Sequence, residues 1–246
     1  MPRWERAVAF DFRSLRVKLF ADGADVSAIE ELAADERICG FTTNPTLMRK
    51  AGVADYEAFA RKVVTIVDGR PVSFEVFADD FAGMERQARL LASLGGNVHV
   101  KIPVTDPSGR SSADLLRALG AEGVHLNVTA IMTVAQVETV TRALENAPSA
   151  IVSLFAGRVA DTGRDPVPIM VDALAVLEGS PNLELLWASP REVLNVVQAH
   201  EIGCDIITLT PDLVAKLDLL GHDLDDYSLD TVQMFHRDAA AAGYDF

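Results

Sequence analysis

One unit of about 25–30 residues recurs along this chain: a short apolar run, a turn, then a stretch with apolar residues at helical spacing. The apolar runs lie at residues 17–23, 40–45, 71–78, 97–104, 125–131, 150–157, 183–189 and 204–211. The helical stretches lie at 28–34, 56–67, 81–94, 113–119, 134–144, 169–177, 193–199 and 213–220. Strands that alternate with helices form a parallel sheet with right-handed crossovers, so the pattern predicts an α/β fold.

The number of units favours one architecture. Eight strand–helix units are the count that closes a (β/α)8 TIM barrel, and 246 residues suit a single barrel. The alternative is an open doubly wound sheet, but no glycine-rich phosphate-binding fingerprint follows the first strand. A further helical segment lies at 229–242. We therefore expect a single barrel domain over 1–246, with an N-terminal extension at 1–16 and a C-terminal helix or tail at 222–246.

The charge balance excludes several classes of partner. The chain has 22 Lys and Arg against 36 Asp and Glu, a formal net charge of −14. Such a chain repels polyanions, which argues against nucleic acid and anionic membrane surfaces as partners. We see no apolar stretch of about 18 residues that would span a membrane and no apolar core of a secretory signal. The two cysteines, Cys39 and Cys204, lie far apart, so we expect a reduced, cytoplasmic protein.

Polar residues gather where the predicted strands end. In a barrel of this kind the chemistry lies at the C-terminal ends of the strands. These ends bring together a lysine, two carboxylates, two amides, several hydroxyls and two arginines: Asp22, Asn44, Glu75, Lys101, Asn127, Thr129, Ser153, Arg158, Ser189, Arg191, Thr208 and Thr210. The pattern predicts one polar site at that end of the barrel.

Lys101 is the most informative of these residues. It lies between Val100 and Ile102 in an apolar strand, and the chain has only five lysines. Loss of hydration disfavours a charged ammonium and exposes a nucleophilic amine, which forms Schiff bases with carbonyl substrates. The alternative is a strand-end lysine paired with Glu75 or Asp22, since buried ion pairs also occur.

The carboxylates and arginines allow two interpretations each. Asp22 and Glu75 fit an acid/base pair in different environments, or a counter-ion of the lysine and a helix-capping acid. Arg158 and Arg191 follow neighbouring strands late in the barrel, where phosphate often binds. They fit a phosphate-binding pair, or they are solvated loop charges. No two histidines have metal-ligand spacing, so we expect no metal and no other cofactor.

Six runs carry a resemblance to a known family: GFTTNPTLMRK, VSFEVFADD, VHVKIPVT, LNVTAIMT, VSLFAGRVADTG and WASPREV. They resemble the transaldolase family, in particular its short form, which includes the closely related fructose 6-phosphate aldolase. The likeness extends from about Val17 to Leu220, with the motifs in the family's order. It implies a metal-free mechanism through a Schiff base.

The resemblance also implies roles for individual residues. Lys101 matches the Schiff-base lysine, and Asp22 matches the acid/base that handles the hydroxyl proton during C–C cleavage. Glu75 and Thr129 match the pair that positions a catalytic water. The expected substrate-binding set has amides for the sugar hydroxyls, a phosphate-binding group and residues beside them: Asn44, Asn127, Ser153, Phe155, Arg158, Ser189 and Arg191.

Two positions bear on which activity the family likeness implies. Transaldolases carry Glu on the third strand and Phe in the sixth-strand motif, as Glu75 and Phe155 do here, where the aldolase carries Gln and Tyr. The sequence departs from the family at Gly23, Leu154 and Val193, and none of these replaces a proposed catalytic group.

We therefore expect a transaldolase that moves a dihydroxyacetone unit between sugar phosphates. The alternatives are an aldolase, which is a lyase, and a non-catalytic sugar-phosphate-binding protein. The net charge of −14 does not exclude a small phosphate, because a few close donors can hold one locally. The short family forms ring-like assemblies, often decamers, so the resemblance also implies a homo-oligomer, pentameric or decameric.

Overall fold

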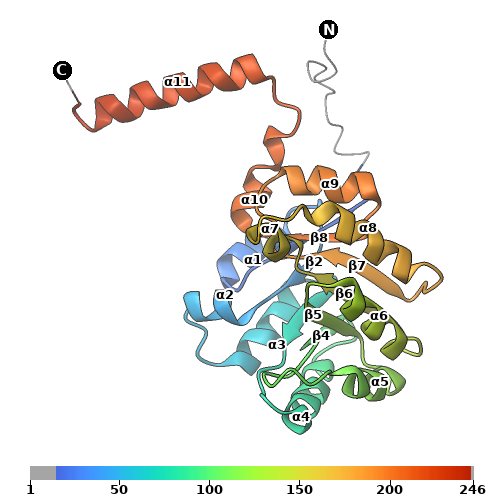
Figure 1. Ribbon diagram of the computed structural model, residues 1–246. Helices are drawn as coiled ribbons and strands as arrows, with labels where there is room; N and C mark the ends of the chain where they lie inside the picture. The colour runs from blue at the N-terminus through green and yellow to red at the C-terminus, as the bar shows by residue number, and fades with distance from the viewer. Residues whose placement is uncertain (1–14, 245–246) are drawn as a thin grey trace. The chain divides into compact units, whose positions relative to one another are not determined.

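The computed structural model describes residues 15–244 and contains a closed barrel of eight parallel strands (Figure 1). The strands are β1 (Lys18–Asp22), β2 (Ile38–Thr42), β3 (Val72–Glu75), β4 (Val98–Pro103), β5 (Leu126–Ile131), β6 (Ala150–Leu154), β7 (Leu183–Trp187) and β8 (Ile206–Leu209). Each strand pairs with the next, and β1 pairs with β8 to close the barrel. The barrel prediction is confirmed, and the open doubly wound sheet is excluded.

Helices surround the strands in Figure 1. Those expected from the sequence are α1 (Val26–Ala33), α3 (Tyr56–Ile66), α4 (Phe81–Ala92), α5 (Ala113–Ala121), α6 (Val134–Ala143), α8 (Pro166–Leu177), α9 (Leu194–Ile202) and α10 (Pro211–Ala215). Side-chain caps begin several of them. Asp80 accepts from the Gly83 amide at the start of α4, and Thr133 with Gln136 forms a capping box on α6.

The sequence pattern missed two short helices, α2 (Pro45–Lys50) and α7 (Ala156–Asp161). Each has only six residues and follows its strand directly, so neither shows the repeated apolar spacing of a longer helix. The start of α2 carries a recognisable signal, because Asn44 caps it and Pro45 opens it. The predicted helix at 213–220 is α10 followed by a 3-10 turn, Leu217–Leu219.

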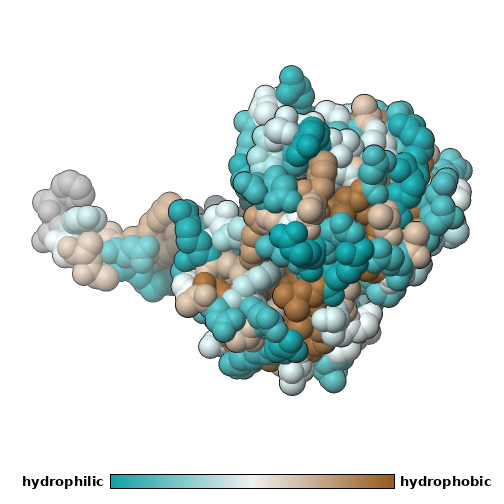
Figure 2. Space-filling model, turned by 90° about the horizontal axis from the view of Figure 1, so that it is seen from below, coloured by the Kyte–Doolittle hydropathy of each residue, from teal (hydrophilic) through white to brown (hydrophobic). Residues whose placement is uncertain are grey.

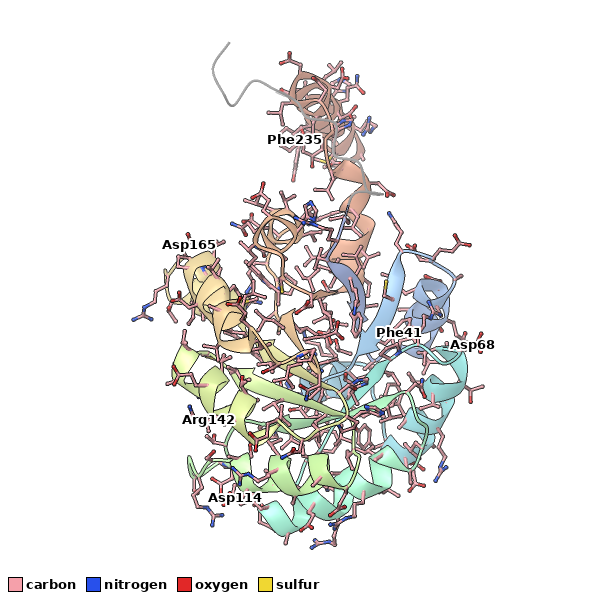
Figure 3. All side chains as sticks on the ribbon, turned by 90° about the vertical axis from the view of Figure 1, so that its right-hand side faces the viewer. Phe41, Asp68, Asp114, Arg142, Asp165 and Phe235 are labelled. Carbon is pink, nitrogen blue, oxygen red and sulfur yellow. The ribbon has the colours of Figure 1, made fainter. Side chains whose placement is uncertain are left out.

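The core lies inside the barrel and between its strands and helices. Phe41, Phe74 and Trp187 are among its largest fully buried side chains. Phe41 lies on the outer face of β2, where Arg70 lies 5.1 Å from the centre of its ring, and Figure 3 labels it there. Asp114 and Arg142 lie on the outer side of the surrounding helices (Figure 3). On the face in Figure 2, brown hydrophobic side chains appear between groups of teal hydrophilic ones.

The chain divides into two compact units. One is 16–214, which contains the barrel, and the other includes the segment from Ala215 onward. That segment carries α11 (Leu224–Ala241), which begins five residues before the predicted 229 because Asp223 caps it. The expected extension at 1–16 lies almost wholly outside the described residues, so the single-domain assignment over 1–246 stays a prediction. Among residues 15–244, we find no helix long and apolar enough to cross a membrane.

Candidate active site

A cavity of about 400 Å³ opens at the C-terminal ends of the strands. Every catalytic and substrate-binding residue predicted from the sequence lines it: Asp22, Asn44, Glu75, Lys101, Asn127, Thr129, Ser153, Phe155, Arg158, Ser189 and Arg191. Thr42, Thr208 and Thr210 line it as well. The closed barrel brings these side chains together from all eight strand ends.

Lys101 is buried, with 6% of its surface exposed. Its Nζ donates a 2.7 Å hydrogen bond to the Thr43 carbonyl and lies 3.2 Å from Oε2 of Glu75. The two residues face each other because Glu75 of β3 is in register with Lys101 of β4. Glu75 is thus the counter-ion considered as an alternative from the sequence. That pairing also puts a proton-transfer group beside the amine.

Asp22 is held at both carboxylate oxygens. Its Oδ1 accepts from Thr42 Oγ1 at 2.9 Å, and its Oδ2 accepts from Asn44 Nδ2 at 3.1 Å. Burial raises the pKa of this carboxyl, while the charge of Lys101 and the two hydrogen bonds oppose that rise. Asp22 is not a helix-capping acid, because Asp25 caps α1. A buried carboxyl with a raised pKa is suited to proton transfer.

Thr129 has an unsatisfied hydroxyl. Its Oγ1 is buried and has no hydrogen-bond partner among residues 15–244. The residue lies on β5 beside the end of β4, and the next residue, Ala130, has a positive φ of 62°. A buried hydroxyl of this kind needs a partner, so it marks a place for a bound water or a substrate oxygen.

Asn127 is the centre of a buried hydrogen-bond chain. Its Nδ2 donates to Ser73 Oγ at 3.0 Å, and its Oδ1 accepts from Ser153 Oγ at 2.7 Å. Asn44 is fixed too, because its Oδ1 accepts from the Leu47 amide while it caps α2. Both amides are therefore rigidly oriented before any ligand arrives.

The two arginines come from the connections that follow β6 and β7. Arg158 lies in α7 and Arg191 follows β7, and both are exposed at the cavity. Arg191 Nε donates to Asp161 Oδ1 at 3.0 Å, and its Nη2 pairs with Asp161 Oδ2. Neighbouring Ser189 has a φ of 60°, a left-handed backbone conformation unusual for serine. Ser189 does not cap α9, because Val193 is the N-cap of that helix.

Phe155 forms an apolar part of the wall. It packs against a buried cluster of Phe20, Ile151, Leu186, Ala188 and Ile206. Leu186 and Ala188 of this cluster also line the cavity, so a bound molecule would meet hydrophobic surface as well as polar groups.

Sequence reasoning assigned no role to three residues that organise the site: Thr42, Thr208 and Asp161. Thr42 lies two residues before Asn44, so the two-residue period of a strand puts both side chains on the same face. That spacing could have predicted Thr42 as a site residue. Thr208 was expected at a strand end, but its contact with Thr42 joins distant segments. The Asp161–Arg191 pair likewise joins the end of α7 to the loop after β7, which are separate in sequence.

The arrangement suits chemistry at a carbonyl group. A buried amine lies beside a carboxylate, a second carboxyl with a raised pKa stands nearby, and arginines at the entrance can bind an anion. Within the described part of the chain, no group of three or more His, Cys, Asp or Glu side chains could hold a metal ion. The absence of a cofactor stays a prediction.

Comparison with known proteins agrees with this geometry. The family model for transaldolase/fructose-6-phosphate aldolase matches residues 19–245. The chain belongs to this family. A probable transaldolase from Methanococcus maripaludis is 35% identical over 215 residues, 87% of this chain and 94% of that relative. One from Thermoanaerobacter sp. is 34% identical, over 92% of this chain and 99% of that relative.

Solved structures share the barrel at lower identity. A monomeric dihydrodipicolinate synthase variant has a TM-score of 0.58 at 13% identity, covering 93% of this chain and 80% of that one. The dihydrodipicolinate synthase of Thermotoga maritima has a TM-score of 0.56 at 13% identity, covering 92% of this chain and 81% of that one. Likeness at this identity shows the fold alone.

Proposed function

We propose that this member of the transaldolase/fructose-6-phosphate aldolase family is a transaldolase. It moves a three-carbon dihydroxyacetone unit from a ketose phosphate to an aldose phosphate through a Schiff base on Lys101. The observation that carries the proposal is the buried Lys101 amine, 3.2 Å from Glu75, in a cavity that also contains Asp22 and the orphan Thr129 hydroxyl.

The reaction begins with attack of the Lys101 amine on the ketone carbon. Glu75 then gives a proton to the adduct through a water held at Thr129, and water leaves to form a protonated imine. Asp22 next takes the proton of the hydroxyl on the fourth substrate carbon. The O–H electrons form the aldehyde, and the electrons of the broken C–C bond pass into the protonated imine, leaving a neutral enamine on Lys101.

Transfer reverses these steps on a second aldehyde. The enamine carbon attacks the carbonyl carbon of the acceptor, and Asp22 returns its proton to the new alkoxide. Water then attacks the imine, with Glu75 and Thr129 again handling the protons. The product ketose leaves and Lys101 is a free amine once more.

The sugar-binding groups follow from the same geometry. The fixed amides of Asn44 and Asn127 suit hydroxyl groups near the reacting carbons. Arg158 and Arg191 suit the phosphate, with Ser153 and Ser189 beside them. A cavity of about 400 Å³ suits a small sugar phosphate rather than a polymer.

Borohydride trapping tests the proposal. Fructose 6-phosphate and borohydride should together add a stable mass to the peptide that contains Lys101. Lys101→Met should lose both this label and activity, whereas Lys62→Met, at an exposed lysine of α3, should lose neither. A wild-type protein without label on Lys101, or an active Lys101→Met variant, would rule the mechanism out.

The family also contains an aldolase, so cleavage without transfer is the second candidate. It differs in its product: an aldolase releases free dihydroxyacetone without an acceptor. A transaldolase requires an acceptor such as erythrose 4-phosphate for turnover. Measuring dihydroxyacetone with and without that acceptor separates the two.

We also propose a cytoplasmic homo-oligomer that uses α11 as a contact surface. No residue of α11 is buried, and its apolar side chains Leu224, Val232 and Phe235 are 77%, 60% and 62% exposed. Apolar side chains in such numbers on one helix are typical of an interface. Both cysteines are free thiols, which suits a reducing compartment.

A further inference from the structure

A hydrogen-bond chain across three neighbouring strands joins Thr208 to Thr42 and Thr42 to Asp22. Thr42 Oγ1 lies 2.6 Å from Thr208 Oγ1 and donates to Asp22 Oδ1 at 2.9 Å. Both threonines are buried, with 3% and 6% of their surfaces exposed. The strands explain the contact: β1, which carries Asp22, pairs with β2 on one side and β8 on the other.

The direction of this chain follows from proton counting. A threonine hydroxyl has one proton to donate and accepts with its lone pairs. Because Thr42 gives its proton to the Asp22 carboxylate, the 2.6 Å bond to Thr208 must be donated by Thr208. The charged form of Asp22 thus fixes the direction in which both hydroxyls donate, and both hydroxyls stabilise the negative charge of the carboxylate.

The chain also fixes the direction in which Asp22 faces. Thr42 occupies one lone pair of Oδ1 and Asn44 occupies one lone pair of Oδ2. The carboxylate is therefore pinned at both oxygens, with further lone pairs left for a substrate hydroxyl in the cavity. Thr208 holds the same Thr42 oxygen from β8, which fixes the direction in which Thr42 donates.

We propose that Thr208 is a positioning residue of this site, which acts through Thr42 to aim the Asp22 carboxylate at the substrate hydroxyl. The proposal rests on the proposed function, in which Asp22 takes that hydroxyl proton before C–C cleavage. Thr208 touches neither the amine of Lys101 nor the reacting atoms in this scheme. Imine formation is therefore independent of it, and only the later proton transfer depends on it.

Removing the Thr208 hydroxyl tests the chain by kinetics. Thr208→Val keeps the shape and should lower kcat by about 3- to 10-fold, the usual effect of one lost hydrogen bond, with KM little changed. Borohydride labelling of Lys101 should stay at the wild-type level. Thr139→Val, which removes an exposed hydroxyl of α6, should match wild type in every assay.

The pH behaviour of Asp22 gives a second readout that needs no substrate. Its environment includes the charges of Lys101 and Glu75 and the amide of Asn44, which all stay in place in Thr208→Val. Without the Thr208 hydroxyl, Thr42 donates a weaker hydrogen bond to the charged form of Asp22, so the titration midpoint of the Asp22 carboxyl carbon, followed by 13C NMR, should rise. Thr208→Ser should restore both the midpoint and kcat.

A matched pair keeps the test decisive if Thr208→Val does not fold. Thr208→Ser and Thr208→Ala differ only in the hydroxyl, so Ser should behave as wild type and Ala should show the loss. In a Thr42→Val background, Thr208→Val should add no further loss, since the link is already broken.

Wild-type kcat and midpoint in the variants without the hydroxyl would overturn the proposal, as would equal losses in Thr208→Ser and Thr208→Ala. Failure of the proposed function looks different. Lys101 would then remain unlabelled in the wild type, while the Asp22 midpoint would still report on Thr208.

Discussion

Gly157 and Ser189 approach so closely that a Cβ on Gly157 would lie 1.5 Å from the carbonyl oxygen of Ser189. The same Cβ would lie 3.2 Å from Nε of Arg191. The Gly157 amide also donates to the Ala188 carbonyl at 3.3 Å. Thus α7, which carries Arg158, packs directly against the loop after β7, which carries Arg191. The positions of both proposed phosphate-binding arginines therefore depend on residue 157 having no side chain.

Gly157→Ala should therefore damage phosphate binding more than chemistry. The carbonyl of Ser189 is backbone and cannot move aside as a flexible side chain would, so α7 and the loop after β7 must separate. We expect the KM for a ketose phosphate to rise by about 10-fold or more and the protein to lose about 1–3 kcal/mol of stability. Steady-state kinetics and thermal unfolding measure these effects. Gly96→Ala, whose Cβ meets nothing within 4 Å, is the control.

Phe155→Tyr should shift the balance from transfer towards release. Phe155 lines the cavity and packs on the buried cluster below it, so a hydroxyl at its ring would enter the site. That hydroxyl can hold water or pass a proton to the enamine, which Phe cannot do. We expect more free dihydroxyacetone per transfer event, measured by coupled assay with and without an acceptor. An unchanged ratio in a folded variant would show that position 155 does not control the partition.

Asp161→Asn should strengthen binding of phosphorylated substrates. Asp161 holds Arg191 through two contacts, and Asn keeps an oxygen for the Nε–H while removing a negative charge from the entrance. Because both groups are exposed, the effect should be small: about a 2-fold lower KM at low ionic strength, vanishing at high salt. The KM for unphosphorylated dihydroxyacetone as donor should not change. A salt-independent effect, or one seen equally with dihydroxyacetone, would contradict this reasoning.

Charged substitutions on α11 test the proposed assembly. Phe235, labelled in Figure 3, and Val232 are both largely exposed, and either would be buried in a contact between copies. Val232→Glu with Phe235→Glu should lower the sedimentation coefficient relative to wild type, because a buried carboxylate without a partner opposes association. Arg237→Glu is the control for added negative charge. If both proteins sediment alike, α11 is not the contact.

The sequence pattern predicted the residues that line the cavity, but not the contacts that hold them in place. Strand-end residues such as Lys101 and Glu75 were found because a parallel strand places its last side chains at a known edge. The Asp161–Arg191 pair and the Gly157–Ser189 approach were not predicted, because each depends on how α7 meets the loop after β7, which is distant in sequence. The short helices α2 and α7 escaped notice since six residues are too few to show a helical period.

His99 should make the barrel less stable in mild acid. It lies two residues before Lys101 on β4, and burial, with a contribution from nearby His125, lowers its pKa from 6.5 to about 4. At pH values between these two pKa values, His99 binds a proton in the unfolded chain but not in the folded chain. The His99 contribution is therefore complete above about pH 6.5 and is lost as the pH falls towards 4. At pH 5 this loss is about 2 kcal/mol.

Urea unfolding at pH 5 and pH 7.5 measures this loss of stability, with His99→Gln as the variant that cannot titrate. The pH-dependent loss should be smaller in His99→Gln by that amount; equal losses in the two proteins would show that His99 is protonated in the folded state.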